Sequence, residues 1–221
     1  IKTPWGVISP QVSLFPIIYL LFIYGFVYIL PYGRDLIGIS WFDWLRREDG
    51  PLEWIQFIEY AISSILALLI YVGAKRKKNI NSMIWLLIAF LSFVIAGEEI
   101  SWGERITGIG INSISDINVQ GETNFHNLPF FHNYLLDPIF EISCIFLGWF
   151  GWRKFKNIKA FPSKDLSLYF LFVALFYFYF DLSWASTTQQ IRNDQEIFEF
   201  LLSTGIFLHC YKNFKKLDFV G

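Results

Sequence analysis

Six apolar segments constrain this chain more than any other feature of its sequence. They cover residues 12–30, 54–72, 83–97, 135–151, 166–184 and 197–211. A helix needs about 20 residues to cross the hydrocarbon core of a bilayer, so the shorter segments must extend into their polar flanks. With 54% hydrophobic and 20% aromatic residues, a chain of 221 residues has no water-soluble core large enough for its apolar side chains. We therefore expect an all-α, polytopic membrane bundle of about six transmembrane helices, forming a single domain over residues 1–221.

The basic residues predict the orientation of this bundle. Thirteen of the 18 Lys and Arg, including every lysine, fall on one side of a six-helix arrangement. They are Lys2, Lys75, Arg76, Lys77, Lys78, Arg153, Lys154, Lys156, Lys159, Lys164, Lys212, Lys215 and Lys216. Cytoplasmic loops of membrane proteins are enriched in Lys and Arg. We therefore expect both termini in the cytoplasm, in the cytoplasmic membrane of a bacterium or an equivalent membrane.

The segment 39–50, with the sequence ISWFDWLRREDG, lies on the opposite, outer side in this arrangement. Its tryptophans alternate with charged residues, a composition that suits the headgroup region of a bilayer. We expect a short helix that lies in the outer interface.

Every apolar segment after the first has a carboxylate in its outer third. These acids are Glu59, Glu98, Glu99, Glu141, Asp181 and Glu199. An ionised acid at mid-membrane costs at least about 2.5 kcal/mol, and such residues usually face the bundle interior or water. The pattern predicts a polar bowl that opens to the non-cytoplasmic side. The alternative is structural for Glu141 and Glu199, which follow helix starts where the helix dipole favours negative charge.

The helix dipole does not explain Glu98 and Glu99, because they end an outward-running helix. They require a partner, which could be Arg105, Arg192, a proton or a metal ion. Arg105, Arg192, Asp181 and Glu59 are the residues that we expect to bind or neutralise other groups in the bowl. If the arginines neutralise the carboxylates, the site is a salt-bridged structural plug.

The outer loop between the third and fourth segments has two of the three histidines, His126 and His132. Glu122 precedes His126 by four residues, and on a helix the two side chains would share a face. The candidate catalytic residues are Glu98, Glu99, Ser101, Glu122 and His126. A divalent metal, zinc or manganese, would be bound by His126, His132 and Glu99. The alternative for the histidines is hydrogen bonding that holds the loop over the bundle.

Three sequence blocks, REDGPLEW, AGEEISWGERI and NVQGETNFHN, lie within residues 46–128. They resemble the EDGxxEW, GEEISWGxR and NxQGExNxHN blocks of a group of uncharacterised bacterial multi-pass membrane proteins. No activity is attached to that group. The resemblance implies that the three blocks form one structural unit, and it implies no function.

Three classes of function fit these features. The first is a membrane enzyme of hydrolase type, metal-dependent or acid–base, that acts at the outer leaflet on a lipid-linked or amphipathic substrate. The second is a non-catalytic subunit of a larger membrane complex. The third is a cation or proton transporter, although the inner halves of the apolar segments have no carboxylate to form a path. The expected partners are the lipid bilayer and other membrane proteins, with no nucleic acid.

Overall fold

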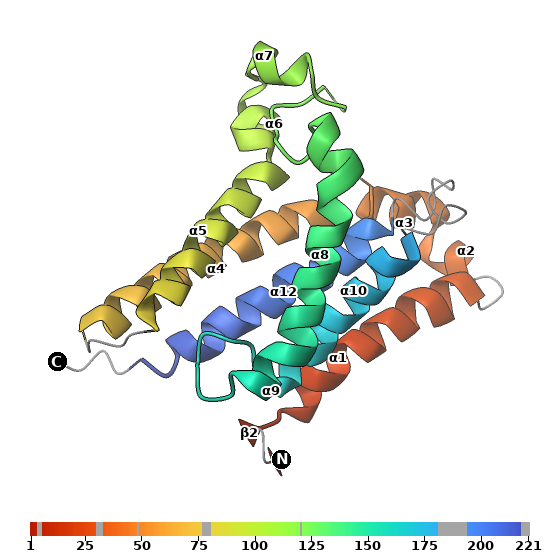
Figure 1. Ribbon diagram of the computed structural model, residues 1–221. Coiled ribbons are helices and arrows are strands. Elements are labelled where there is room, and N and C mark those ends of the chain that lie inside the picture. The colour runs from red at the N-terminus through yellow and green to blue at the C-terminus, as the bar shows by residue number, and fades with distance from the viewer. Residues whose placement is uncertain are drawn as a thin grey trace.

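The computed structural model describes residues 1–3, 6–29, 33–47, 49–76, 81–119, 121–180 and 194–217 (Figure 1). The regular secondary structure of the described residues is helical except for one pair of antiparallel two-residue strands, β1 (Lys2–Thr3) and β2 (Gly6–Val7). The prediction of an all-α chain is therefore confirmed.

The helices follow the apolar segments closely. In chain order they are α1 (Pro10–Leu20), η1 (Leu21–Ile29), α2 (Gly33–Ile37), α3 (Ile39–Leu45), α4 (Pro51–Arg76), α5 (Ser82–Glu99), η2 (Ser101–Gly103), α6 (Glu104–Thr107), α7 (Asn112–Ser115), η3 (Phe131–Leu135), α8 (Leu136–Ile145), η4 (Phe146–Gly151), α9 (Trp152–Lys154), η5 (Lys164–Leu166), α10 (Ser167–Phe180) and α12 (Gln195–Phe214). The short helix expected within residues 39–50 is α3.

Three helices are long and apolar enough to cross a membrane, judged by length and composition. They are the continuous helix Pro10–Ile29, α4 and α5. These helices indicate that the protein is located in a membrane. The prediction that the chain crosses the membrane six times, and the prediction that both termini are cytoplasmic, stay predictions.

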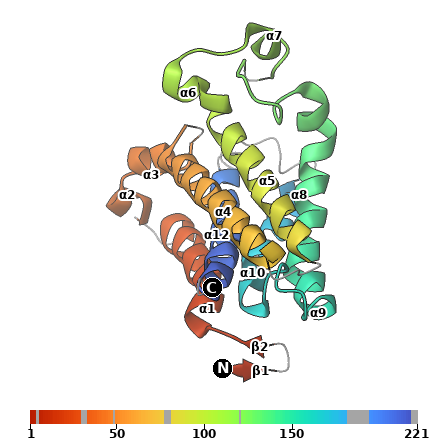
Figure 2. The ribbon, with the colours of Figure 1, turned by 90° about the vertical axis from the view of Figure 1, so that its left-hand side faces the viewer.

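Helix α4 is at the centre of one half of the bundle, where it packs between α5 and α12. Helix α10 packs against α12 and α8, and α1 packs against α10 (Figures 1 and 2). Helices α6 and α7 and the loop that follows them lie beyond the end of α5 (Figure 2). The bundle thus brings the start of α4, the end of α5 and the start of α12 to the same end of the molecule.

Large apolar side chains remain exposed on the outer faces of the bundle. On α4, Ile58 and Ile65 are 50% and 60% exposed, and on α5, Phe90 and Phe93 are 60% and 58% exposed. Contiguous apolar surface of this kind is rare in soluble monomers and marks contact with lipid or protein. The exposed faces agree with a membrane environment for α4 and α5.

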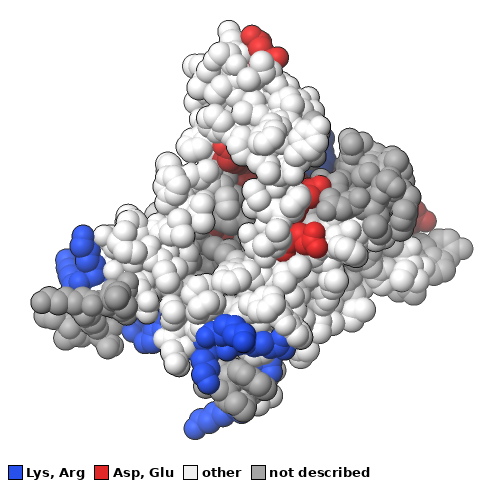
Figure 3. All heavy atoms as spheres, viewed as in Figure 1, with Lys and Arg blue, Asp and Glu red and all other residues white. Residues whose placement is uncertain are grey.

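The charged residues are segregated along the bundle. On the face drawn in Figure 3, most Lys and Arg atoms lie at one end and most Asp and Glu atoms lie nearer to the other. The basic end includes the end of α4 and the end of α12, with Lys75, Arg76, Lys212 and Lys216. The acidic end includes the region where α5 ends and α6 begins.

Candidate functional site

Arg105, in the short helix α6, holds together carboxylates from separate parts of the chain. Its Nη1 lies 2.6 Å from Glu53 Oε1 in α4, and its Nε lies 2.9 Å from Asp49 Oδ1 just before α4. Its Nη2 lies 3.1 Å from Glu122 Oε2 in the loop after α7. Nη1 also donates a hydrogen bond of 2.9 Å to the carbonyl oxygen of Glu99 at the end of α5. We call Arg105, Asp49, Glu53 and Glu122 the Arg105 cluster.

The Arg105 cluster is largely shielded from water. The side chains of Arg105 and Glu53 are 11% and 10% exposed, that of Glu122 is 25% exposed, and that of Asp49 is 58% exposed. Burial alone would lower the pKa of Arg105, but the charges of Glu53, Glu122 and Asp49 raise it above its ordinary value. The guanidinium therefore stays charged, and its contact with Glu53 is the buried ion pair of the cluster.

Glu122 also orders the start of the loop that contains it. Its Oε2 accepts hydrogen bonds from Ser101 Oγ at 2.7 Å and from Asn124 Nδ2 at 2.8 Å. Ser101 and Asn124 are both buried. Among the described residues, no histidine is hydrogen-bonded to Ser101, so a serine nucleophile with a histidine base is not assembled here.

Glu98 holds the second part of the same loop. Its Oε2 accepts hydrogen bonds from the backbone amides of Phe125 (2.7 Å) and His126 (2.9 Å), and it lies 3.1 Å from His126 Nδ1. Its Oε1 accepts a hydrogen bond from the indole nitrogen of Trp102. These donors compensate for the unfavourable position of a carboxylate at the C-terminal end of a helix.

The pairing suggested by the spacing of Glu122 and His126 does not form. Residues 121–128 make turns rather than a helix, so a spacing of four residues does not bring the two side chains onto one face. His126 is instead bound by Glu98, and Glu122 is bound by Arg105. Glu122 therefore holds the first part of the loop and Glu98 holds the part that follows, and together they fix the loop against the end of α5.

A left-handed turn after α5 brings these groups together. Ser101, Trp102 and Gly103 have φ angles of 47°, 53° and 93°. This conformation costs about 1–2 kcal/mol for a residue other than glycine, so the surrounding contacts must hold the first two residues in it. The turn folds the Trp102 ring back over Gly97, where a Cβ atom would lie 2.9 Å from the ring. A glycine at position 97 therefore lets the indole approach close enough to bind Glu98.

Four carboxylates from three helices lie near one another beside the Arg105 cluster. Glu99 of α5 interacts electrostatically with Glu53 of α4 and Glu199 of α12, and Glu196 of α12 interacts with Glu53, Glu99 and Glu199. Glu53 is paired with Arg105, whereas the Glu99 side chain makes no hydrogen bond or ion pair with any residue that the structure describes. Like charges in a low-dielectric site cannot all be ionised without a large cost. We call these four residues the acidic group.

Gln56, one turn after Glu53 on α4, adds an unsatisfied polar atom to the acidic group. Its side chain is fully buried, and its Nε2 donates a 2.9 Å hydrogen bond to Glu196 Oε2. Its Oε1 has no hydrogen-bond partner within the described part of the chain. An unpaired buried acceptor costs about 1–3 kcal/mol. The arrangement is suited to a donor beside Gln56, such as water, a substrate hydroxyl or a protonated carboxyl group.

Of the remaining residues expected to neutralise or bind, the structure describes only Glu59. Glu59 accepts hydrogen bonds from Ser203 Oγ at 2.6 Å and from Thr204 Oγ1 at 3.0 Å, so it joins α4 to α12. Asp181 and Arg192 lie outside the described residues. Their part in the site therefore stays a prediction.

A metal site built on His126, His132 and Glu99 is also untested, because the side chain of His132 lies outside the described part of the structure. Among the described side chains, no three of His, Cys, Asp and Glu are arranged to hold a metal ion. The imidazole of His126 contacts Glu98 instead. Zinc or manganese binding therefore stays a prediction that depends on His132.

A second buried charge cluster, at the start of α12, was missed in the sequence. Arg46 Nη1 lies 2.5 Å from Asp194 Oδ1, and Nη2 lies 2.9 Å from Asp43 Oδ1. The hydroxyl groups of Tyr24 and Tyr28 donate to Asp194 at 3.0 and 2.8 Å. Burial raises the pKa of Asp194 above its ordinary value, although the hydrogen bonds and the charge of Arg46 oppose that shift. Arg46 and Asp194 are distant in sequence, so no local motif could reveal their contact.

No family model matches this chain, and neither the curated proteins nor the solved structures contain a significant match to it. A function for this chain is therefore inferred from the geometry of its own residues. Asp49 and Glu53, which sequence reasoning left out of the site, come from the first of the three sequence blocks, REDGPLEW. Arg105 comes from the second block and Glu122 from the third. Residues of all three blocks therefore meet in the Arg105 cluster.

Proposed function

We propose that this chain is a polytopic membrane enzyme that uses the acidic group for hydrolase-type acid–base chemistry. Its substrate is lipid-linked or amphipathic, and the enzyme binds it at the outer leaflet of a bacterial cytoplasmic membrane or an equivalent membrane. In this proposal the chain crosses the membrane six times, with the termini and lysines in the cytoplasm. The segregation of charge along the bundle supports that orientation, because basic residues favour the cytoplasmic side.

The observation that supports the proposal best is the excess of carboxylates over cations among the described residues of the site. Arg105 is already shared by Glu53, Asp49 and Glu122. Glu99 adds a carboxylate that has no direct partner in the described part of the chain. A further carboxylate with no cation of its own does not stabilise a structural salt-bridge cluster, and placing it within a membrane costs free energy. Interacting carboxylates in a shielded setting are typical of catalytic sites.

Carboxyl groups that share protons supply both partners of general acid–base catalysis. In the reaction that we propose, ionised Glu196, to which Gln56 donates a hydrogen bond, accepts a proton from water while the water oxygen attacks an ester or phosphoester. Protonated Glu99 gives its proton to the leaving alcohol, a proton then passes from Glu196 to Glu99 to restore the starting state, and one water is consumed for each bond broken. Gln56 Oε1 accepts a hydrogen bond from the attacking water or from the substrate. Ser101, Glu122, Glu98 and His126 then hold the loop rather than react.

The test compares membranes that contain the wild-type chain with membranes that contain Glu99→Gln. Glu141→Gln is the matched control, because it removes a carboxylate of α8 that is not part of the acidic group. Mass spectrometry of the lipids should show that one lipid-linked class decreases and its hydrolysis products increase with the wild type and with Glu141→Gln. Glu99→Gln, produced in equal folded amount, should leave that class unchanged. Identical lipid profiles for all three proteins would contradict the enzyme proposal.

One observation favours a non-catalytic subunit as the second candidate. Glu98, Ser101, Glu122 and His126 are all engaged in contacts that fix the loop, as a docking surface requires. Its test is native electrophoresis of gently solubilised membranes that contain the chain at its natural level. A discrete assembly several times larger than the chain would favour this candidate, and migration as a small particle would contradict it.

A further inference from the structure

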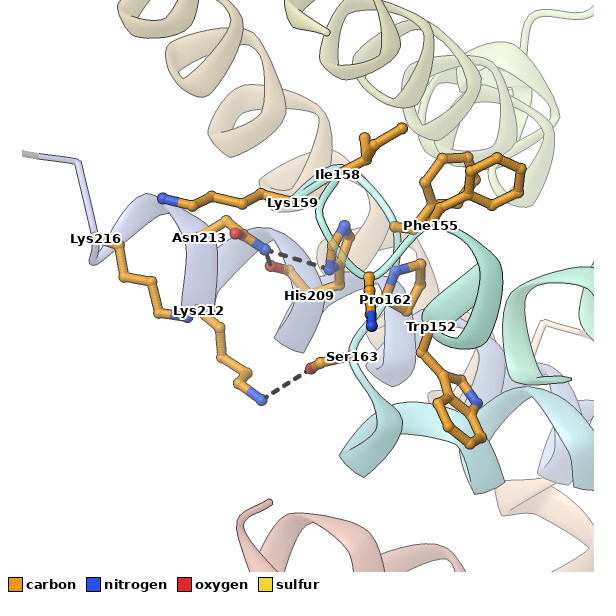
Figure 4. A pocket seen from close by; sticks show the side chains of 12 residues that line it. Trp152, Phe155, Ile158, Lys159, Pro162, Ser163, His209, Lys212, Asn213 and Lys216 are labelled. Atoms are coloured by element: carbon orange, nitrogen blue, oxygen red, sulfur yellow. Dashed lines mark hydrogen bonds between the residues drawn. The ribbon is translucent and has the colours of Figure 1, made fainter. Parts of the chain in front are cut away.

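A pocket lies at the basic end of the bundle, at the opposite end of α12 from the acidic group. Glu196 and Lys212 are about 24 Å apart along the helix by its rise. The pocket has a volume of about 170 Å³ and lies between α12 and the loop 155–163, which joins α9 to η5 (Figure 4). Its polar lining includes four lysines, Lys156, Lys159, Lys212 and Lys216.

The pocket has more positive charge than its surroundings neutralise. Lys212 is ion-paired with the buried carboxylate of Asp165, and its Nζ lies 3.4 Å from Ser163 Oγ. The side chains of the other three lysines are exposed and make no ion pair or hydrogen bond with the residues that the structure describes. Figure 4 shows Lys159, Lys212 and Lys216 along one side of the pocket. Three uncompensated charges around one hollow favour an anionic ligand.

The walls of the pocket are held by contacts of their own. His209 is buried, its Nε2 donates to the carbonyl oxygen of Ala160 at 3.0 Å, and its Nδ1 accepts from Asn213 Nδ2 at 3.3 Å. An imidazole with one donating and one accepting nitrogen is neutral. Its ring stacks on Trp85 of α5, with centroids 5.1 Å apart. His209 therefore fixes the loop against α12 and leaves the charge of the pocket to the lysines.

The other side of the pocket is aromatic and continues into exposed apolar surface. Trp152, Phe155 and Phe161 line it, and the Phe155 and Phe161 rings are stacked at 4.6 Å. On the preceding turn of η4, Trp149 and Phe150 are 47% and 44% exposed. This apolar surface lies directly beside the lysines and is suited to contact with the acyl chains of a lipid.

We propose that this pocket binds a phosphate group, supplied by an anionic lipid headgroup or by a free phosphate compound. Its volume is below the ~300–1,000 Å³ of pockets for drug-sized ligands, so it suits one small charged group. Basic pockets between membrane helices on the cytoplasmic side bind anionic headgroups. This site is separate from the acidic group, and it does not depend on the proposed enzyme activity.

The experiment titrates the full-length chain in neutral detergent with phosphatidylglycerol and, separately, with inorganic phosphate. Native mass spectrometry counts bound lipid, and the thermal midpoint reports phosphate binding. The test variant is Lys156→Gln/Lys216→Gln. The control is Lys75→Gln/Lys154→Gln, which removes the same charge from the same end but outside the pocket. Each lysine near an anionic group contributes enough that the test variant should bind about tenfold more weakly or worse.

A loss of phosphatidylglycerol binding in the test variant alone supports the lipid as the source. Stabilisation of the wild type, but not of the test variant, by inorganic phosphate alone supports a free phosphate compound. Diacylglycerol, which has the same tails and no phosphate, should not compete. Equal weakening in both variants, or no binding of either ligand to the wild type, overturns the proposal.

Discussion

Replacing Arg105 with methionine would remove the guanidinium while keeping a long side chain in its place. The buried carboxylate of Glu53, 10% exposed, would lose its counter-ion, and Glu122, 25% exposed, would lose one of its donors. Glu53 would keep the 2.5 Å hydrogen bond from the backbone amide of Asp49. The variant therefore measures what a single cation contributes to the contact between α4, the end of α5 and the loop.

The expected magnitude follows from these contacts. Removing one partner of a buried ion pair costs about 3–5 kcal/mol. Asp49 is 58% exposed, so its contact with Arg105 adds no more than about 1 kcal/mol. The amide that still binds Glu53 offsets part of the loss. We expect the free energy of unfolding to fall by about 3 kcal/mol, which lowers Tm by about 6–12 °C for a chain of this size.

Thermal unfolding in detergent, followed by tryptophan fluorescence, measures this change. Arg47→Met is the matched control, because Arg47 is exposed and lies in the same region of the molecule. Adding Glu53→Gln to Arg105→Met should recover about half of the loss, since the buried charge is then gone. A Tm within about 1 °C of the wild type for Arg105→Met would refute the reasoning. So would a double variant that is less stable than the single one.

Three further predictions concern the turn after α5, the loop that Glu98 binds and the membrane topology. Gly97→Ala should lower stability by about 1–3 kcal/mol, because the added Cβ would lie 2.9 Å from an indole ring, whereas Gly25→Ala, with no neighbour within 4 Å, should melt like the wild type. Glu98→Gln should speed hydrogen exchange, read by mass spectrometry, at the two loop amides that it binds, since a neutral acceptor is weaker; unchanged exchange would mean that other contacts hold the loop. In intact cells, a membrane-impermeant maleimide should label Ile109→Cys, at a position that is 79% exposed, and spare Lys154→Cys. The reverse labelling would invert the predicted topology.

The positions of the helices could be predicted because a long apolar segment needs no tertiary information to become helical in a membrane. The segment 54–72 corresponds to α4, which extends further at both ends, from Pro51 to Arg76. The extensions have local causes: proline fits the first turn of a helix, and basic side chains fit the last. The sequence limits of the apolar segments therefore underestimate the helices.

The site could be predicted only in part, because its contacts join distant residues. The helix dipole indicates that Glu98 needs a donor, but it does not indicate that the donors are backbone amides of a loop 27 and 28 residues later. The spacing of Glu122 and His126 was misleading because it assumed a helix where the chain makes turns. Gln56 gave no signal at all, since a buried amide with an unpaired oxygen looks like any other polar residue in the sequence.

The long-range pairing of Arg105 with Glu53 has a consequence for biosynthesis. Arg105 leaves the ribosome about fifty residues after Glu53, a delay of a few seconds at ~5–20 residues per second. During that interval α4 reaches the membrane with Glu53 and Glu59 before the cation, the serine and the threonine that bind them have been made. The newly made α4 therefore depends on neutralised carboxyl groups, or on help from the insertion machinery, until the later helices arrive.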